Sequence, residues 1–500
     1  MTNLDYYVMP WYQKFFVKIG LFFASVGKGI AHFFCAIPGA IAGFFKMIGR
    51  GLAWYGKTLA SGSIGTKLSY LIMGAGNLLH AQFIKGLIFL ATEVAYIWFM
   101  INSGWTNILK LGNLGTTPRV EFFDEVYGIY RYPQEGEYDN SMLILLYGVF
   151  TIIITIAFIC MYVANIKSSV YADECKSTGH KPPKFIDDIK NLLDGGFHKT
   201  LLFLPILGIL IFTITPLIYM ISLAFTNYDA NHQVPGNLFT WIGLSNFGKL
   251  MNSNLPLGKT FWNLLGWTLI WAVFATFLNY IGGIILALGI NRKGVPCKGL
   301  IRTLFVMSIA VPQFVSLLVM RNLLAAHGPI NETLLSLGWI RNALPFFTDP
   351  VWAKVTVILV NLWVGIPYTM LMVSGILMNI PEDLYEAGRI DGASPVVMFT
   401  QITMPYILHV TTPYLITQFT GNINNFNVIY FLSGGGPETL EYYQAGKTDL
   451  LITWLYKLTV SSRDYNYAAT IGIMVFVILA VVSLITFRNS GSYKNEEAFQ

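Results

Sequence analysis

Charged residues are scarce in this sequence of 500 residues. Asp, Glu, Lys and Arg together make up 12% of the chain, against about 25% in soluble globular proteins. Hydrophobic residues make up 54%. This shortage of charge excludes an ordinary soluble protein and indicates an integral membrane protein. The net charge of +6 does not indicate nucleic-acid binding, because the basic residues gather in segments where cytoplasmic loops are expected.

Catalytic and metal-binding motifs are also missing. The histidines are scattered without forming a metal pair, and the cysteines show no metal-ligand spacing (Cys35, Cys160, Cys175 and Cys297). There is no phosphate-binding GxxxxGK[ST] motif, so we do not expect this chain to bind ATP. The sequence therefore predicts no catalytic residue, no metal site and no cofactor in this chain.

Long apolar runs dominate what is present. A transmembrane helix needs about 20 mostly apolar residues. The runs that qualify lie near residues 84–101, 141–164, 200–225, 262–290, 301–325, 352–380, 406–432 and 468–487. We therefore predict an all-α integral membrane protein with about eight transmembrane helices.

The charges between these runs predict their orientation. The segment before the first run is basic, and so are the loops after the second and fourth runs. The loop after the first run is acidic between Glu121 and Asp139. Basic loops stay on the cytoplasmic side, so we predict that both termini are cytoplasmic.

Residues 1–80 combine Phe, Gly, Ile and Trp with regularly recurring Lys and Arg. No run there is both long enough and sufficiently free of charged residues to span the bilayer easily. We expect amphipathic helices on the anionic inner leaflet. A short hairpin around residues 15–45 and a docking surface for a neighbouring protein remain alternatives.

A polar segment between the sixth and seventh runs has a distinctive spacing. It reads Glu386-Ala387-Gly388, three residues, Gly392, nine residues, Ile402-x-Met404-Pro405. Pro381 followed by two acids predicts a helix start, and Gly392 predicts its end before a second helix. By topology this loop is cytoplasmic. Its small residues would allow close approach of a partner, and the carboxylates of Glu386 and Asp391 could meet partner arginines.

Two of the apolar runs carry polar stripes. In the seventh, Gln418, Asn422 and Asn425 are four and three residues apart and are expected on one helical face. The sixth run repeats this spacing in Asn361, Gly365 and Tyr368. Amide and phenol groups suit a neutral, hydroxyl-rich ligand. They equally suit hydrogen bonds between helices, and the residues alone leave both alternatives open.

The 386–405 loop resembles the "EAA" loop of ABC importer permeases. From about residue 200 onward the chain is similar to the larger permease subunits of maltose-type ABC importers. Further segments that carry the resemblance are Val311-Pro312-Gln313, Trp363-Val364-Gly365-Ile366-Pro367-Tyr368, Asn424-Asn425-Phe426, Gly434-Gly435-Gly436-Pro437 and Ala445-Gly446-Lys447-Thr448-Asp449-Leu450-Leu451.

This resemblance implies a type I importer core of six helices, the third to eighth runs. It places the permease core at residues 200–490, followed by a cytoplasmic tail at 491–500. Before the core lie the 1–80 region and two additional helices at 81–199. It also implies a coupling helix that would sit in a cleft of an ATPase subunit. The residues carried over to it are Glu386, Ala387, Gly388, Asp391, Gly392, Ile402 and Pro405.

The resemblance further implies a sugar permease of a bacterial cell membrane, for maltose or maltodextrins. The implied partners are a second, homologous permease subunit, two ATPase subunits that bind ATP and Mg, and an extracytoplasmic sugar-binding protein. The sugar contacts map onto Gln313, Gly365, Tyr368, Gln418, Asn422, Asn425 and Asn427. Gln313, Gln418 and Asn427 depart from the family's residue types, which leaves the sugar and its length open.

Two other kinds of function remain as alternatives. An ion-coupled secondary transporter often carries ionisable groups within its spans. The core runs are nearly free of them, and the main exception is Glu93 in the first run, outside the implied core. A membrane scaffold that uses the loop only for docking is the other alternative, and the polar stripes argue against it.

Overall fold

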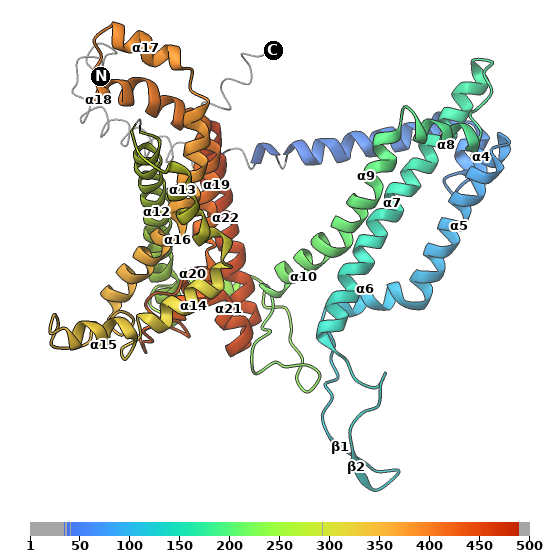
Figure 1. Ribbon diagram of the computed structural model, residues 1–500. Coiled ribbons are helices and arrows are strands. Elements are labelled where there is room, and N and C mark those ends of the chain that lie inside the picture. Colours follow the sequence, from blue (N-terminus) through green and yellow to red (C-terminus); the bar gives the residue numbers. More distant parts are fainter. Residues whose placement is uncertain (1–34, 36–37, 41, 293, 490–500) are drawn as a thin grey trace. The chain divides into compact units, whose positions relative to one another are not determined.

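The computed structural model of the chain describes residues 35, 38–40, 42–292 and 294–489, which are predominantly helical (Figure 1). They pack as two compact units. The N-terminal unit holds Phe34–Ser245 with Asp464–Ala469, and the C-terminal unit holds Asn246–Arg463 with the described residues from Thr470 onward. The predicted tail at 491–500 and residues 1–34 of the predicted amphipathic region lie outside the described residues. The predicted domain boundary at residue 200 stays a prediction.

The N-terminal unit begins with a helix over residues 42–61. Its further elements are α3 (Ile64–Leu68), α4 (Ala75–Leu79), α5 (Phe83–Phe99), η1 (Met100–Gly104), α6 (Trp105–Leu111), β1 (Phe122–Asp124), β2 (Ile129–Arg131), α7 (Ser141–Ser177), α8 (Phe185–Leu193), α9 (Phe197–Ile209), η2 (Leu210–Ile214) and α10 (Thr215–Leu223). The acidic loop after the first span thus contains an antiparallel hairpin, in which Phe123 lies opposite Tyr130.

The C-terminal unit is built on long helices, and its last helix begins in the other unit. Its elements are α11 (Ser245–Met251), α12 (Pro256–Asn291), α13 (Lys298–Ala310), α14 (Gln313–Leu323), α15 (Pro329–Ser336), α16 (Pro350–Met378), α17 (Glu382–Ile390), α18 (Pro395–Met398), η3 (Phe399–Thr403), α19 (Met404–Ile423), α20 (Phe426–Val428), η4 (Ile429–Ser433), α21 (Leu451–Lys457), η5 (Leu458–Ser462) and α22 (Tyr465–Asn489).

Six helical segments in the described part of the chain are long and apolar enough to cross a membrane. They are Phe83–Leu111, Ser141–Ser177, Phe197–Leu223, Pro256–Asn291, Pro350–Met378 and Tyr465–Leu484. Each matches one predicted run. The α13–α14 pair is a seventh candidate, and α19 corresponds to the first part of the seventh predicted run. The multi-pass helical architecture is therefore confirmed.

The fifth predicted run is not one continuous helix, which corrects the expectation for residues 301–325. Helices α13 and α14 meet at an angle of 91°. Val311 and Pro312 between them have extended ψ angles of 129° and 127°. Proline disfavours a helical conformation in the residue before it and donates no backbone hydrogen bond, so the helical ladder stops there.

The seventh predicted run also ends earlier than expected. Helix α19 stops at Ile423, and Asn424 follows as its C-cap. Asn425 lies outside the helix as the N-cap of α20, where its side chain accepts a hydrogen bond from the Val428 N–H at 3.2 Å. Asn425 therefore does not share a continuous helical face with Gln418 and Asn422, because the helix ends between them.

The core of the C-terminal unit forms where α12 packs along α16. Gly282 and Gly283 of α12 lie against Ile366 and Thr369 of α16, closely enough that a Cβ at either glycine would collide with those side chains. Small residues allow two helices to approach closely and gain packing contacts. Apolar side chains including Trp271, Val357 and Met370 are fully buried around this contact. The α12–α16 pair therefore gives the unit a rigid wall.

A buried carboxylate organises the loop between α19 and α22. Asp449 accepts hydrogen bonds from the Gly446 N–H at 2.8 Å and from the Thr453 hydroxyl at 2.8 Å, and it pairs with Lys457 at 2.6 Å. Burial raises the pKa of Asp449, although Lys457 opposes the shift. The Gly-rich turn at 434–437 and the segment 445–451, which both carry the family resemblance, pack together here through Gly435.

Candidate functional site

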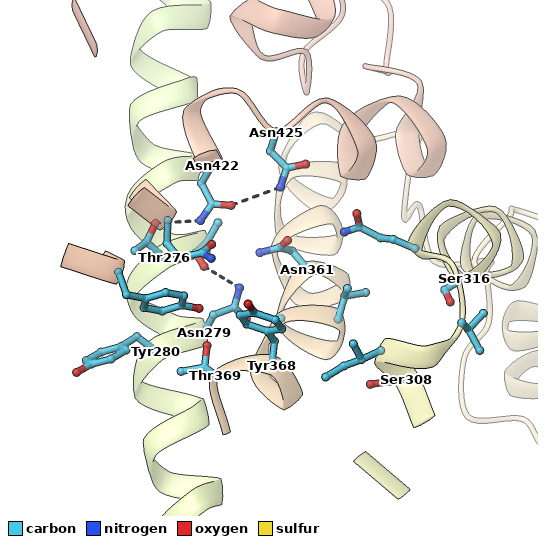
Figure 2. A pocket seen from close by; sticks show the side chains of 18 of the residues that line it. Thr276, Asn279, Tyr280, Ser308, Ser316, Asn361, Tyr368, Thr369, Asn422 and Asn425 are labelled. Atoms are coloured by element: carbon cyan, nitrogen blue, oxygen red, sulfur yellow. Dashed lines mark hydrogen bonds between the residues drawn. The ribbon is translucent and has the colours of Figure 1, made fainter. Parts of the chain in front are cut away.

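A cavity of about 470 Å³ opens in the C-terminal unit between α12, the α13–α14 bend, α16 and α19 (Figure 2). Its walls combine polar with apolar side chains, and none of the described residues that line it is charged. The polar lining residues are Thr276, Asn279, Tyr280, Ser308, Gln313, Ser316, Asn361, Tyr368, Thr369, Tyr414, Gln418, Asn422 and Asn425. Amides and hydroxyls both donate and accept hydrogen bonds, so this wall suits a neutral ligand rich in hydroxyl groups.

Most of the predicted sugar-site residues line this cavity. They are Gln313, Gly365, Tyr368, Gln418, Asn422 and Asn425. The bend at Pro312 brings the start of α14, with Gln313, to the cavity. The Asn425 amide donates to the Asn422 Oδ1 at 3.4 Å, and the Asn422 amide donates to Thr276 at 3.0 Å (Figure 2). The amides thus form a connected row along one wall.

Asn427 is the one predicted sugar contact that does not line the cavity. It lies on α20, and its amide donates to the Gln313 Oε1 at 3.3 Å. Its direct role in a sugar site therefore rests on the resemblance alone. The hydrogen bond can orient the Gln313 side chain, which does line the cavity.

Helix α12 supplies lining residues that the sequence analysis missed, including Thr276, Asn279 and Tyr280. Ser308 and Ser316 flank the bend, and Figure 2 shows both on the side of the cavity opposite α12. The available signal was Asn279, an amide in the middle of an otherwise apolar run. Polar groups at such depth face a cavity or another helix.

Two cavity amides carry buried atoms without a hydrogen-bond partner among the described residues. They are the Asn361 Nδ2, a donor, and the Asn279 Oδ1, an acceptor. Asn361 is 5% exposed, so its free donor is well shielded from water. An unsatisfied buried polar atom costs roughly 1–3 kcal/mol. Both residues line the cavity, so a rotation of either side chain would present its unpaired atom to a ligand there.

Gly365 is where α16 approaches Asn279 most closely. A Cβ at Gly365 would collide with the Asn279 amide. The Gly365→Ala variant should therefore show a lower apparent Tm in detergent, because overpacking a tight site costs ~1–3 kcal/mol. Gly375→Ala is the matched control on the same helix, where no atom lies within 4 Å of the added Cβ. Equal Tm values for both variants would contradict this packing account.

The second candidate site is the loop from α17 to the start of α19. Pro381 precedes α17, which begins with Glu382 and Asp383 as expected for a helix N-terminus. Gly392 follows the helix with a φ of +76°, and the Ala393 N–H donates to the Gly388 carbonyl at 2.9 Å. This is a Schellman-type helix end, which favours glycine at the left-handed position. The predicted helix, turn and second helix are confirmed.

The two arms of this loop are braced against each other. Gly388 of α17 faces Ile402 and Met398, with an added Cβ 3.4 Å from the Ile402 Cδ1. The Tyr385 hydroxyl lies 2.9 Å from the Thr403 hydroxyl. Gly388 and Ile402, two of the predicted coupling residues, therefore stabilise the loop from within. The motion of one arm should carry the other.

Other predicted coupling residues face outward. Glu386, Ala387, Asp391, Gly392 and Pro405 are exposed. Two apolar side chains that the sequence analysis did not single out project beside them: Ile390 is 86% exposed and Val396 is 71% exposed. The outward surface of this loop therefore combines carboxylates with exposed apolar side chains.

The described residues form a helical protein with membrane-spanning candidates, an uncharged cavity lined in large part by polar side chains, and a loop whose two arms contact each other. Residues 279–490 match the family described as "Binding-protein-dependent transport system inner membrane component". Two curated relatives from Bacillus subtilis (strain 168) are similar over 85% of this chain. The galactooligosaccharides transport system permease protein GanP is 33% identical over 97% of its own length. The maltodextrin transport system permease protein MdxF is 35% identical over 95% of its length. The chain belongs to this family of transport system inner membrane components.

One solved structure is similar in fold. It is described as a bacterial ABC transporter involved in the import of the acidic polysaccharide alginate. Its chain matches with a TM-score of 0.50 and 23% identity, covering 60% of this chain and 96% of that one. This likeness supports the ABC permease fold predicted from the sequence.

Proposed function

We propose that this chain is a permease subunit of an ATP-driven importer for neutral oligosaccharides of the maltodextrin class. The observation that carries the proposal is the cavity, whose polar lining has amides, hydroxyls and phenols but no charge. An acidic polysaccharide would call for Arg or Lys to pair with its carboxylates. The relatives named for maltodextrin and galactooligosaccharides support a neutral sugar.

The proposed mechanism is alternating access. A binding protein delivers sugar on the outer side, and the sugar enters the cavity between α12, α14, α16 and α19. Closure of two ATPase subunits, which hold ATP and Mg, moves the loop at Glu386 and opens the cavity outward to receive the sugar. ATP hydrolysis and release then return the cavity to its inward-open state. The sugar needs no bond broken, so the chain requires no catalytic residue of its own.

The loop is proposed to fit a cleft of an ATPase subunit. Ile390 and Val396 would enter an apolar depression there, while Glu386 and Asp391 would face basic residues. The Gly388–Ile402 contact and the Tyr385–Thr403 hydrogen bond then transmit the displacement into α19. Since α19 carries Gln418 and Asn422, movement of the loop changes the cavity wall directly.

The rest of the assembly follows from the same proposal. A second, homologous permease subunit would complete the pathway. The chain would lie in a bacterial cell membrane with both termini cytoplasmic, since the segments before the first predicted run and after the second and fourth runs are basic.

Glu93, the main ionisable residue within a span that favoured ion-coupled transport, has a partner in the protein. The Glu93 carboxylate in α5 accepts a hydrogen bond from the Met73 N–H at 2.8 Å, which gives it a structural role. Uptake by the reconstituted complex tests the proposal. Maltodextrins should be imported in an ATP-dependent way, whereas alginate oligosaccharides should not; efficient import of the acidic sugar would contradict the neutral-sugar assignment.

A further inference from the structure

The helix over residues 42–61 has one apolar and one basic face. At about 100° per residue, Phe44, Ile48, Leu52 and Leu59 fall within ~80° of one another. Lys46, Arg50 and Lys57 fall within ~40° on the opposite side. Phe44 is 56% exposed and Leu52 is 66% exposed in the structure. Residues 42–61 contain no Asp or Glu.

The helix is attached to the rest of the N-terminal unit through Tyr55, which falls within the apolar sector, and through Trp54 and Thr58 beside that sector. Trp54, Tyr55 and Thr58 are half-buried, while the other side chains from 42 to 61 are exposed. The Tyr55 hydroxyl lies 3.3 Å from the Tyr162 hydroxyl of α7, and the Lys167 ammonium lies over the Trp54 ring. Figure 1 shows the helix, in dark blue, running crosswise to α7. Apart from Tyr55, the apolar residues Phe44, Ile48, Leu52 and Leu59 remain at least 39% exposed.

The attachment point sets the depth of the helix in a bilayer. Helix α7 begins at Ser141 and is free of charge until Lys167. About 20 residues at 1.5 Å each cross the ~30 Å hydrocarbon core. A span that begins at Ser141 therefore reaches the lipid headgroups near Tyr162. The helix over 42–61 contacts α7 at this level.

Hydrogen bonds of polar side chains attach the segment after the helix to α7. The segment with α3 and α4 follows the helix and is bound to the projecting end of α7. Asp173 of α7 accepts hydrogen bonds from Ser63 at 2.6 Å and Thr66 at 2.5 Å. The Asn165 side chain accepts from the Gly74 N–H at 2.8 Å and donates to the Ser69 carbonyl at 3.0 Å. These bonds hold the segment that follows the helix against α7.

We infer that the helix over residues 42–61 binds the surface of an anionic bilayer, at the end of α7 that carries Lys167. Phe44, Ile48, Leu52 and Leu59 enter the acyl boundary. Lys46, Arg50 and Lys57 lie within the field of the anionic headgroups, which falls off within a Debye length. The large apolar face with basic residues and no acid fits lipid better than it fits a protein partner.

Spin labels on the full-length protein test this inference independently of transport. The four native cysteines are first replaced by serine, and single cysteines are then placed in turn along residues 44–59. The protein is reconstituted in phosphatidylcholine vesicles with and without phosphatidylglycerol. Collision of a spin label with oxygen shows that the label lies in lipid. Collision with a water-soluble nickel chelate shows that the label is exposed to water. Oxygen access should peak at 44, 48, 52 and 59, and nickel access at 46, 50 and 57.

Phosphatidylglycerol should deepen the labels at 48 and 52, and the Lys46→Gln/Arg50→Gln/Lys57→Gln variant should remove that effect. Nickel access at every position would overturn the inference by placing the helix in water. Low access to both reagents at 44, 48 and 52 would overturn it in favour of a protein partner. If the depth of the labels does not change with phosphatidylglycerol, the helix has no preference for anionic lipid, and that claim would be overturned.

Discussion

Replacing Gly392 by proline should reduce ATP-driven uptake by the reconstituted complex by at least about tenfold, which corresponds to ~1.4 kcal/mol. Gly392 has a φ of +76°, whereas proline is fixed near −65°. The turn between α17 and α18 cannot form with proline, so α17 would point in a different direction. Uptake and ATP hydrolysis should be measured on the same preparation, where hydrolysis should persist without uptake.

The matched control is Gly338→Pro. Gly338 also has a positive φ, +70°, and no atom lies within 4 Å of an added Cβ. It lies in the loop after α15, away from the proposed coupling surface. Both variants introduce the same kind of backbone strain, but only Gly392→Pro should uncouple the complex. Normal uptake by a folded Gly392→Pro protein would rule out the coupling role.

Removing a single carboxylate from the proposed coupling surface tests the same role with a smaller change to the protein. Glu386→Ala should also lower uptake relative to ATP hydrolysis, because it removes an exposed carboxylate proposed to face the ATPase. Glu332→Ala removes an exposed carboxylate from α15 and should leave both activities unchanged. Equal effects of the two substitutions would count against a specific contact at Glu386.

Replacing Asn361 by leucine should raise the KM for sugar uptake by about tenfold or more, because losing hydrogen bonds to the sugar costs roughly 1–3 kcal/mol. Asn361 lines the cavity, and its Nδ2 has no hydrogen-bond partner among the described residues. Leucine has a similar size and no polar group, so the fold should survive. The rate of ATP hydrolysis without sugar should stay unchanged, which separates sugar binding from ATPase docking.

Asn263→Leu on α12 is the control for the pocket. Asn263 is exposed, bonds to the Lys259 carbonyl of its own helix at 2.9 Å and does not line the cavity. Asn425→Ala should weaken uptake in the same direction as Asn361→Leu, because Asn425 belongs to the amide row. A KM equal to that of the unchanged protein in both pocket variants would refute the assignment of the cavity.

Sequence reasoning located the long helices well, because a span of apolar residues must be helical to satisfy its backbone in lipid. It also located the helix–turn–helix around Gly392, since the proline, the acids and the glycine act locally. It did not predict the 91° bend between α13 and α14. Pro312 explains why the helix breaks, but the angle depends on packing against other helices.

The cavity could be predicted only in part. Periodicity grouped Gln418 with Asn422 correctly, yet it extended the face to Asn425 although the helix ends at Ile423. Asn279 was missed because one amide in a long apolar helix does not form a stripe. The exposure of Ile390 and Val396 was not predicted either. The sequence of a short loop helix does not show which of its apolar side chains are packed against the rest of the protein.

Uptake of labelled maltodextrin into sealed vesicles is the decisive measurement of ATP-driven sugar import by this chain. The vesicles should contain this chain, the second permease and the ATPase subunits, with the binding protein outside and ATP inside. The account predicts accumulation that requires both ATP and the binding protein and that persists after proton and sodium gradients are collapsed. Accumulation driven by an ion gradient in the absence of ATP would contradict it.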